Sequence, residues 1–397
     1  MKPIKGVMTI RIALVTWTLS PPFGSGGVAR YVNRLATALC ELGHEVVVFY
    51  AYGYSPGKTE DPFKVKRIST SNVPVLRQFQ FCRKLRKELS NSRFDIVHAH
   101  IPQLVWAISN DSILVITIHT TSRGEAIGVI KGGLDSASDI AQLIVFKTIG
   151  RALEFAGIKS ARTIITVNPC ITSEVSYLVR NRQTNVITSE QAVETRTLVS
   201  FDRKAVRESL GIKGSDFVVL FVGRLDARKN PLVLLEAFAQ AISGGGHQLR
   251  LIYCGEGTLG DKLRRRISQL SLDGVVNSLG LVDEETLSKV YSAADVFVLP
   301  SEIEGFPLTL LECRQYGLPA IVGPYPGVEA AIVHGFNGIV LDAINVGSIA
   351  AQIGYLLNNP SKLREMSSNA LKLAHLSNSW ENVARESVEL YTTLLDK

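Results

Sequence analysis

Short apolar runs rich in β-branched residues alternate with amphipathic helical stretches along all 397 residues of the chain. This alternation is typical of βαβ units, in which helices cover both faces of a parallel sheet. In the first half we expect strands at residues 10–17, 45–50, 95–100, 113–119 and 163–167. In the second half we expect them at residues 217–223, 248–254, 275–279, 295–299, 320–323 and 338–341. The sequence therefore predicts an α/β fold with parallel sheets.

The strand pattern falls into two halves, and a chain of this length exceeds one ordinary hydrophobic core. Because the pattern blurs in the polar segment 184–203, we predict one domain over residues 1–195 and a second over 196–377. We expect the last segment, 378–397, to form a helix that packs back on the first domain. Two Rossmann-like domains facing across a cleft would place the carboxyl ends of both sheets at that cleft, where ligands bind.

The chain is basic, with 43 Lys and Arg against 36 Asp and Glu and a net charge of +7. This balance suits anionic partners such as nucleotide diphosphates, phospholipid head groups or nucleic acid. The cations are spread out, and the short clusters at 83–87 and 264–266 are typical of solvated helix faces. We therefore expect no nucleic-acid partner, and peripheral contact with an anionic membrane stays open as the alternative.

The five cysteines are scattered without C-x-x-C spacing, which favours a reducing compartment over a disulfide framework or a structural zinc site. The apolar start of the chain is interrupted by Arg11 and fits a buried first strand better than a signal peptide. No run of about 18 consecutive apolar residues exists that could span a bilayer. We expect a cytoplasmic protein, with contact at the inner face of the membrane as the alternative.

A glycine loop at residues 23–27 follows the first strand and opens a helix. Glycines at such a place let backbone amides approach an anion at the positive end of the helix. The spacing of Gly24, Gly26 and Ala29 satisfies a loose dinucleotide pattern, but no acidic residue follows the second strand to bind a ribose. A tight turn and a ligand loop therefore both remain open, and an NAD-dependent enzyme is disfavoured.

A basic loop at residues 223–230 directly follows a predicted buried strand. Three of its residues are cations, and Pro231 begins the next helix, so the loop suits concentrated negative charge. Arginine offers a planar fork for phosphate oxygens and lysine a mobile point charge. We expect Arg224, next to the strand end, and Lys229 to contact the ligand, and Arg228 to be an exposed loop residue.

The segment 300–312 carries two glutamates, Glu304 and Glu312, around a predicted helix start at Pro307. Eight helical residues would separate the two by about 12 Å, whereas hydrolytic carboxylate pairs lie roughly 5–9.5 Å apart. We therefore expect the two side chains to touch different parts of one elongated ligand. Solvated helix glutamates are the alternative, which fits Glu312 less well because an unpaired carboxylate is costly in an apolar stretch.

His98 and His100 alternate at the end of one predicted strand, and His119 ends the next. A His-x-His pair could bind a metal, but no carboxylate or cysteine lies in register to complete the site. We therefore expect no metal. For His119, a ligand contact at the carboxyl end of its strand and a satisfied histidine at a sheet edge both remain open.

Together these segments resemble glycosyltransferase family 4, the retaining enzymes of the GT-B fold. The residues that carry the resemblance read GGVARYV, FDIVHAH, ITIHT, GRLDARKN, CGEG, LGLVDEETLSKVYSAADVFVLPS and EGFPLTLLE, the last being the E-x7-E element. The chain departs from the family in NVITSEQAVET before the second domain, in the missing acidic residue after ITIHT, and at 325–329, where a Gly-Gly pair is usual.

The resemblance implies an enzyme that moves a hexose from a nucleotide diphosphate sugar to a hydroxyl acceptor of a glycan, a lipid or a small molecule. It implies that Arg224 and Lys229 neutralise the diphosphate, that Glu312 anchors the ribose, and that Glu304 and His119 face the transferred sugar. It also implies further donor contacts at backbone positions, namely Gly26, Gly27, Gly280, Val282, Gly305, Phe306, Pro307 and Leu308.

The resemblance further implies same-face attack by the acceptor hydroxyl, assisted by the leaving phosphate, with retention at the anomeric carbon. Preorganised cations and helix-end amides can stabilise a departing diphosphate without a metal or another cofactor. Two alternatives stay open: a GT-B relative that acts on the sugar nucleotide itself, as an epimerase or a hydrolase, and a sugar-nucleotide binding protein without turnover.

Overall fold

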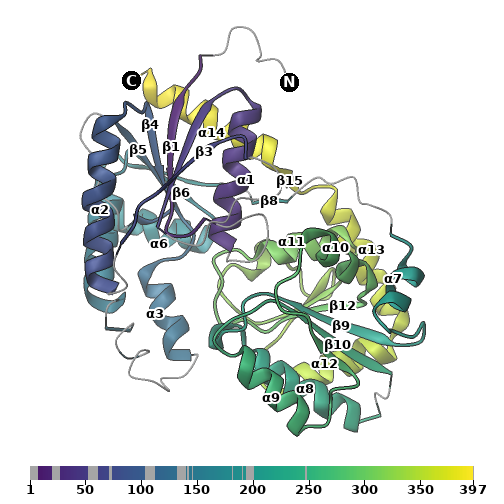
Figure 1. Ribbon diagram of the computed structural model, residues 1–397. Helices are drawn as coiled ribbons and strands as arrows, with labels where there is room; N and C mark the ends of the chain where they lie inside the picture. The colour runs from purple at the N-terminus through teal and green to yellow at the C-terminus, as the bar shows by residue number, and fades with distance from the viewer. Residues whose placement is uncertain are drawn as a thin grey trace. The chain divides into compact units, whose positions relative to one another are not determined.

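The computed structural model divides the chain into two compact α/β units (Figure 1). Unit 1 comprises Met1–Ala126, Ile140–Glu194 and Asn378–Lys397, and unit 2 comprises Ile127–Asp139 and Thr195–Ser377. The inclusion of Ile127–Asp139 in unit 2 is not foreseen by the sequence pattern. The structure describes the following residues: 8–19, 27–51, 61–70, 74–102, 112–131, 140, 143–144, 146–180, 182–189, 191–193, 201–245 and 248–396.

Unit 1 is built on a seven-stranded parallel sheet with the order β3-β2-β1-β4-β5-β6-β7. Its strands are β1 (Arg11–Val15), β2 (Glu45–Tyr50), β3 (Lys64–Arg67), β4 (Ile96–Ala99), β5 (Ile113–Ile118), β6 (Thr163–Thr166) and β7 (Asn185–Thr188). All five strands expected from the sequence are present. The two edge strands, β3 and β7, were not expected from the sequence. Strand β3 is fully exposed and basic and β7 is polar, so neither shows the apolar pattern of a buried strand.

The helices that accompany these strands are α1 (Gly27–Glu41), α2 (Pro74–Asn91), α3 (Ser122–Lys131), the π-helical turn η2 (Phe146–Gly150), α5 (Arg151–Ser160), α6 (Pro169–Val179) and α14 (Trp380–Leu395). Helix α3 begins in unit 1 and crosses into unit 2 after Ala126. Helix α1 ends as its sequence predicts, because Gly43 adopts a left-handed conformation with φ of 94°. Helix α14 lies beside α1, and Trp380 packs edge-on against Tyr31 at 5.0 Å between ring centroids (Figure 1). The two-residue strands β8 (Ala192–Val193) and β15 (Asn378–Ser379) pair in parallel where the chain leaves and re-enters unit 1.

Unit 2 is built on a six-stranded parallel sheet with the order β11-β10-β9-β12-β13-β14. Its strands are β9 (Phe217–Val222), β10 (Leu249–Cys254), β11 (Val276–Ser278), β12 (Val296–Leu299), β13 (Ala320–Val322) and β14 (Gly338–Val340), which are the six expected from the sequence. Its helices are α7 (Arg203–Ser209), η3 (Ala227–Lys229), α8 (Pro231–Ser243), α9 (Gly260–Gln269), α10 (Glu284–Ala293), α11 (Leu308–Gln315), η4 (Val328–Ala330), α12 (Val346–Asn358) and α13 (Pro360–Ala374).

The hydrophobic core of unit 2 lies between its sheet and the helices on both faces. Every residue of β9 is buried, and so is every residue of β12, as continuous apolar strands predict. In the sheet, β10 and β11 lie on one side of β9, and β12, β13 and β14 lie on its other side, so the strand order reverses between β9 and β12. In unit 1 it reverses in the same way around β1, between β2 and β4. Parallel sheets bind ligands beyond the carboxyl ends of their strands at such points.

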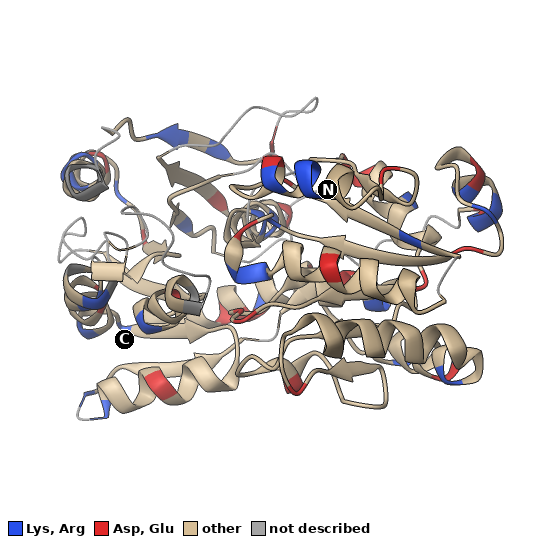
Figure 2. Cartoon of the chain, turned by 90° about the horizontal axis from the view of Figure 1, so that it is seen from below, with Lys and Arg blue, Asp and Glu red and all other residues tan. Residues whose placement is uncertain are grey.

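Charged residues of both signs occur on helices of both units, as on α5 and α9. Figure 2 shows Lys and Arg interspersed with Asp and Glu along the helices. Within the described part of the chain, no helix is both long and apolar enough to cross a membrane.

Candidate active site

The basic loop and the acidic segment lie together at the point where the strand order of unit 2 reverses. The loop follows β9 and the segment follows β12, and these two strands are neighbours in the sheet. Two hydrogen bonds join the segments: Asn230 Nδ2 donates to the Pro300 carbonyl at 3.0 Å, and the Glu302 amide donates to the Arg228 carbonyl at 3.0 Å. The side chains that the sequence singles out in both segments are therefore parts of one site.

Glu304 lies at the centre of this site, with only 8% of its side chain exposed. Lys229 Nζ lies 2.5 Å from Glu304 Oε1, Ser301 Oγ donates to the same oxygen at 2.8 Å, and Arg228 Nη1 lies 3.3 Å from Oε2. Burial alone would raise the pKa of Glu304, but the charges of Lys229 and Arg228 and the hydrogen bonds from Lys229 and Ser301 lower it to about 2. The carboxylate is therefore ionised at neutral pH.

The three cations of the basic loop have different surroundings. Lys229 is buried against Glu304, whereas the side chain of Arg224 is 60% exposed and lies 3.2 Å from Asp226. The expectation of an exposed Arg228 is wrong, because its guanidinium donates to the Ile303 carbonyl at 2.8 Å and pairs with Glu304. A peptide carbonyl in the acidic segment holds Arg228, and the local sequence gives no sign of that contact.

Two glycines, Gly255 and Gly257, allow the chain after β10 to lie in close contact with the chain after β9. A Cβ on Gly255 would lie 2.0 Å from the Gly223 carbonyl oxygen, and one on Gly257 would lie 2.5 Å from the Leu225 carbonyl oxygen. The Gly255 amide donates to the Gly280 carbonyl at 2.7 Å, and Gly280 itself has a φ of 67°. Gly280 therefore lies at the same end of the sheet as the basic loop, and Val282 follows it, half-buried against the core.

Glu312 is buried on α11, where Tyr291 Oη donates to its Oε2 at 3.0 Å. Tyr291 comes from α10 and stacks on Tyr316 at 5.3 Å between ring centroids. No local sequence pattern singles out Tyr291, although a buried tyrosine hydroxyl usually needs a polar partner.

The N-terminus of α11 separates Glu304 from Glu312. The helix begins at Leu308, directly after Pro307 at the N-cap, so Gly305 and Phe306 belong to the non-helical approach. Only the stretch from Leu308 to Glu312 is helical, and it rises by about 6 Å. The fully helical spacing of about 12 Å considered for the two glutamates therefore does not occur.

The three histidines stack in unit 1, at the carboxyl ends of β4 and β5. His98 and His100 lie 4.5 Å apart between ring centroids, and His100 and His119 lie 5.4 Å apart. His98 bonds Tyr391 Oη at 2.6 Å through Nδ1 and Thr117 Oγ1 at 2.7 Å through Nε2. Both ring nitrogens of His98 are thus engaged with hydroxyl groups, which leaves neither for a metal.

Burial keeps the histidine stack neutral. It lowers the pKa of His98 to about 3, with the charge of His119 adding to the effect, and lowers that of His119 to about 4. His100 Nδ1 lies 3.1 Å from His119 Nε2, whereas the buried Nε2 of His100 has no hydrogen-bond partner among the described atoms. Within the described residues, no group of three His, Cys, Asp or Glu is arranged to hold a metal.

A cavity of about 260 Å³ adjoins this stack, and Trp17, Gln78, His100, His119 and Glu125 contribute to its lining. It lies beyond β1, β4 and β5, where the strand order of unit 1 reverses. Val28, in the first turn of α1, also lines it, next to Gly27 at the helix start. Gly26, the other glycine expected to approach phosphates, lies outside the described residues, as do Gly24 and Ser25.

Two family models match the chain, one on each side of the predicted boundary. The model of glycosyltransferase family 4 matches residues 25–187, and that of the glycosyl transferases group 1 matches residues 202–373. The chain belongs to glycosyltransferase family 4. The second match spans the whole cluster around Glu304 and Glu312, and the first spans the histidine stack.

Relatives of this glycosyltransferase match over nearly the whole chain. An uncharacterised glycosyltransferase of Methanocaldococcus jannaschii is 28% identical over 98% of this chain and 99% of its own. A D-inositol 3-phosphate glycosyltransferase of Pseudarthrobacter chlorophenolicus is 26% identical over 98% of this chain and 96% of its own. An Anabaena protein solved in complex with UDP-glucose shares the fold with a TM-score of 0.73, at 18% identity over 97% of this chain and all of its own. The fold of this glycosyltransferase is accordingly GT-B.

Proposed function

We propose that this glycosyltransferase transfers a hexose from a nucleotide diphosphate sugar to a hydroxyl acceptor, with retention at the anomeric carbon and without a metal. One observation carries the proposal. Lys229 and Glu304 come from two adjacent strand ends and pair where strand order reverses in unit 2, and the exposed Arg224 follows the same strand as Lys229. The Anabaena protein in complex with UDP-glucose supports a nucleotide sugar as the donor.

In this proposal the cations bind the diphosphate. Arg224 is exposed and can turn its planar guanidinium toward phosphate oxygens, while Lys229 supplies a fixed positive charge beside the strand end. Negative charge grows on the diphosphate as the bond to the sugar breaks. Cations that are already in place stabilise that charge without reorganisation, and so favour the transition state.

Glu304 has two functions in the proposal. Its charge holds the Lys229 ammonium in position, and its oxygens accept hydrogen bonds from hydroxyls of the transferred sugar. A carboxyl group with a pKa of about 2 does not donate a proton at neutral pH, so Glu304 is not a general acid. The acceptor proton would instead pass to the leaving phosphate.

The remaining assignments concern the nucleoside and the sugar. Glu312, held by Tyr291, accepts the ribose hydroxyls, and the backbone near Gly280 and Val282 meets the base. His119 is neutral and can exchange hydrogen bonds with a sugar hydroxyl without adding charge. The amides of Gly305, Phe306 and Leu308 lie at the start of α11, whose positive end favours an anionic ligand.

Nucleotide binding tests the donor side. Calorimetric titration with UDP, GDP and ADP should show binding to at least one of them, and Glu312→Ala should abolish that binding. No binding of any nucleotide to the wild-type chain would overturn the proposal. Glu329→Gln, an exposed glutamate on η4, is the matched control and should bind as the wild type does.

Product analysis tests the reaction. Incubation with a nucleotide sugar and candidate acceptors should join the sugar to an acceptor with the donor's anomeric configuration, as followed by NMR. Free sugar or an epimerised nucleotide sugar would favour the hydrolase or epimerase alternative. Activity should persist after treatment with a chelator, and its loss would contradict the metal-free mechanism.

A further inference from the structure

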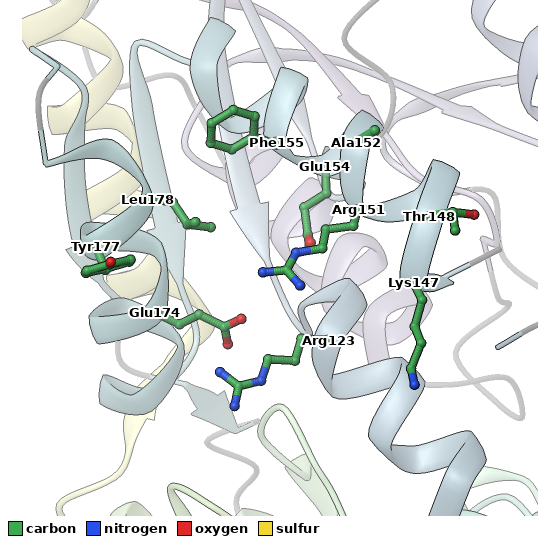
Figure 3. A pocket seen from close by; sticks show the side chains of 10 residues that line it. All are labelled: Arg123, Lys147, Thr148, Arg151, Ala152, Glu154, Phe155, Glu174, Tyr177 and Leu178. Carbon is green, nitrogen blue, oxygen red and sulfur yellow. The ribbon is translucent and has the colours of Figure 1, made fainter. Parts of the chain in front are cut away.

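A second and larger pocket lies in unit 1, apart from the cavity beside His119. It has a volume of about 630 Å³, within the range of small-molecule sites. The first turn of α3, the turn η2, and helices α5 and α6 line it (Figure 3). Neither the assignments made for the donor nor the histidine stack uses this pocket.

Three cations line the pocket from three different elements: Arg123 from α3, Lys147 from η2 and Arg151 from α5. Figure 3 shows the guanidinium groups of Arg123 and Arg151 pointing into the space between α3 and α6, with Lys147 to one side. Within the described part of the chain, none of the three forms a salt bridge. Two arginine forks that share one space suit an anion with several oxygens, such as a phosphate group.

Two glutamates also line the pocket, and both bind the loop that follows β5. Glu154 is buried and accepts a hydrogen bond from the Ser122 amide at 2.9 Å, and Glu174 accepts one from Thr121 Oγ1 at 3.2 Å. Burial raises the pKa of Glu154, although its hydrogen bonds to Ser122 oppose the shift. The carboxylates thus position the loop, and the charge of Arg151 also acts on Glu154, so the three cations of the lining face two carboxylates.

The loop after β5 and the first turn of α3, which follows it directly, are shared between the larger pocket and the smaller cavity. Thr120, Ser122 and Glu125 line the cavity together with His119, whereas Arg123 lines the larger pocket. A ligand in the pocket would therefore lie one loop away from the histidine that the proposed function assigns to the transferred sugar.

Two aromatic side chains also line the pocket, one from α5 and one from α6. Phe155 is 37% exposed and Tyr177 is 66% exposed, and both line the pocket. Lys159 Nζ lies over one face of the Phe155 ring at 3.8 Å from its centroid, and the Arg180 guanidinium lies over one face of the Tyr177 ring at 4.5 Å. The other face of each ring can pack against the CH groups of a sugar or polyol ring, while the arginines bind a charged substituent of the same molecule.

We infer that this pocket binds a phosphate group carried by the acceptor, so that the acceptor is a small phosphorylated sugar or polyol. The inference rests on the proposed transfer to a hydroxyl acceptor. Arg123 and Arg151 bind the phosphate, Phe155 and Tyr177 contact the ring, and the hydroxyl that receives the hexose lies toward the shared loop.

Calorimetry on the full chain tests the phosphate site separately from the donor site. Inorganic phosphate and a panel of sugar and polyol phosphates are titrated with the donor site already saturated by the nucleotide diphosphate that binds. We expect binding to the wild type and about 10- to 100-fold weaker binding to the double variant Arg123→Gln, Arg151→Gln, since each substitution removes a charge-assisted hydrogen bond. Lys87→Gln, which removes one exposed cation from α2, should bind as the wild type does.

Transfer assays then ask whether the phosphate belongs to the acceptor. Each phosphorylated acceptor is compared with its unphosphorylated parent, and the double variant should raise KM only for the phosphorylated one. Two results would overturn this inference and leave the proposed function standing, provided that the wild type binds a nucleotide. The first is that the wild type does not bind phosphate. The second is that the double variant binds phosphate as tightly as the wild type does. Phosphate binding without any preference for phosphorylated acceptors would overturn it too. Failure of the wild type to bind any nucleotide would instead refute the proposed function.

Discussion

Replacing Glu304 by glutamine keeps the size of the side chain and one hydrogen-bonding oxygen but removes the charge that Lys229 and Arg228 share. The pKa of Glu304 lies at about 2 against an ordinary 4.5, a difference of about 2.5 units. At 1.36 kcal/mol per unit, the ionised carboxylate stabilises unit 2 by about 3 kcal/mol at pH 7. We therefore expect Glu304→Gln to lower the free energy of unfolding by about that amount.

The stabilisation by the Glu304 carboxylate should depend on pH. A carboxylate with a lowered pKa stabilises the fold above about pH 4.5, and this contribution is lost as the pH falls toward 2. The difference in unfolding free energy between wild type and Glu304→Gln should therefore stay near its full value down to about pH 5 and fall to about half by pH 3.

Urea unfolding of both proteins between pH 7 and pH 3, followed by the fluorescence and circular dichroism of the full chain, measures this difference. Glu329→Gln changes the same charge at an exposed position and should show almost no difference from the wild type at any pH. A pH-independent difference for Glu304→Gln would refute the reasoning, because it would mean that packing and not charge stabilises the cluster.

Three further predictions concern other parts of the molecule. Gly255→Ala places a Cβ 2.0 Å from a backbone oxygen and should lower the free energy of unfolding, measured with urea, by about 3 kcal/mol or more. Gly274→Ala is the control, because Gly274 has open space around it, and should change that free energy by less than about 1 kcal/mol. The stacked histidines stay neutral in the folded protein but take up protons when it unfolds. The free energy of unfolding should therefore fall by about 2 kcal/mol for each histidine as the pH is lowered from 7 to 5, and His98→Gln should make this fall smaller. Tyr291→Phe removes the hydrogen bond to Glu312 and should weaken nucleotide binding about 10-fold in calorimetry, whereas unchanged affinity would contradict a role for that bond.

Much of the fold follows from the sequence because its strands are buried on both faces and their apolar runs are continuous, as in β9 and β12. Strands β3 and β7 are edge strands with exposed or polar residues, so their sequences do not predict them. Their hydrogen bonding to the neighbouring strands of the sheet identifies them as strands. Helix ends were foreseeable where a glycine or proline marks them, as at Gly43 and Pro231.

The candidate site was predictable only in part. Arg224, Lys229, Glu304 and Glu312 stand out because they follow buried strands or interrupt apolar stretches. The surroundings of Arg228 could not be foreseen, since its partners come from about 75 residues further along the chain. Tyr291 was missed for the same reason, because its role depends on the position of α11 relative to α10 and not on any local pattern.

The pairing of β8 with β15 has a consequence for biosynthesis. Unit 1 is completed by the last 20 residues of the chain, including Tyr391, which holds His98, and Trp380, which packs on Tyr31. During translation the first unit therefore cannot be completed before residues 378–397 have been made, and by then all residues of the second unit have been synthesised. Loss of residues 378–397 would accordingly remove the contacts of Tyr391 with His98 and of Trp380 with Tyr31, and would leave the cluster around Glu304 intact.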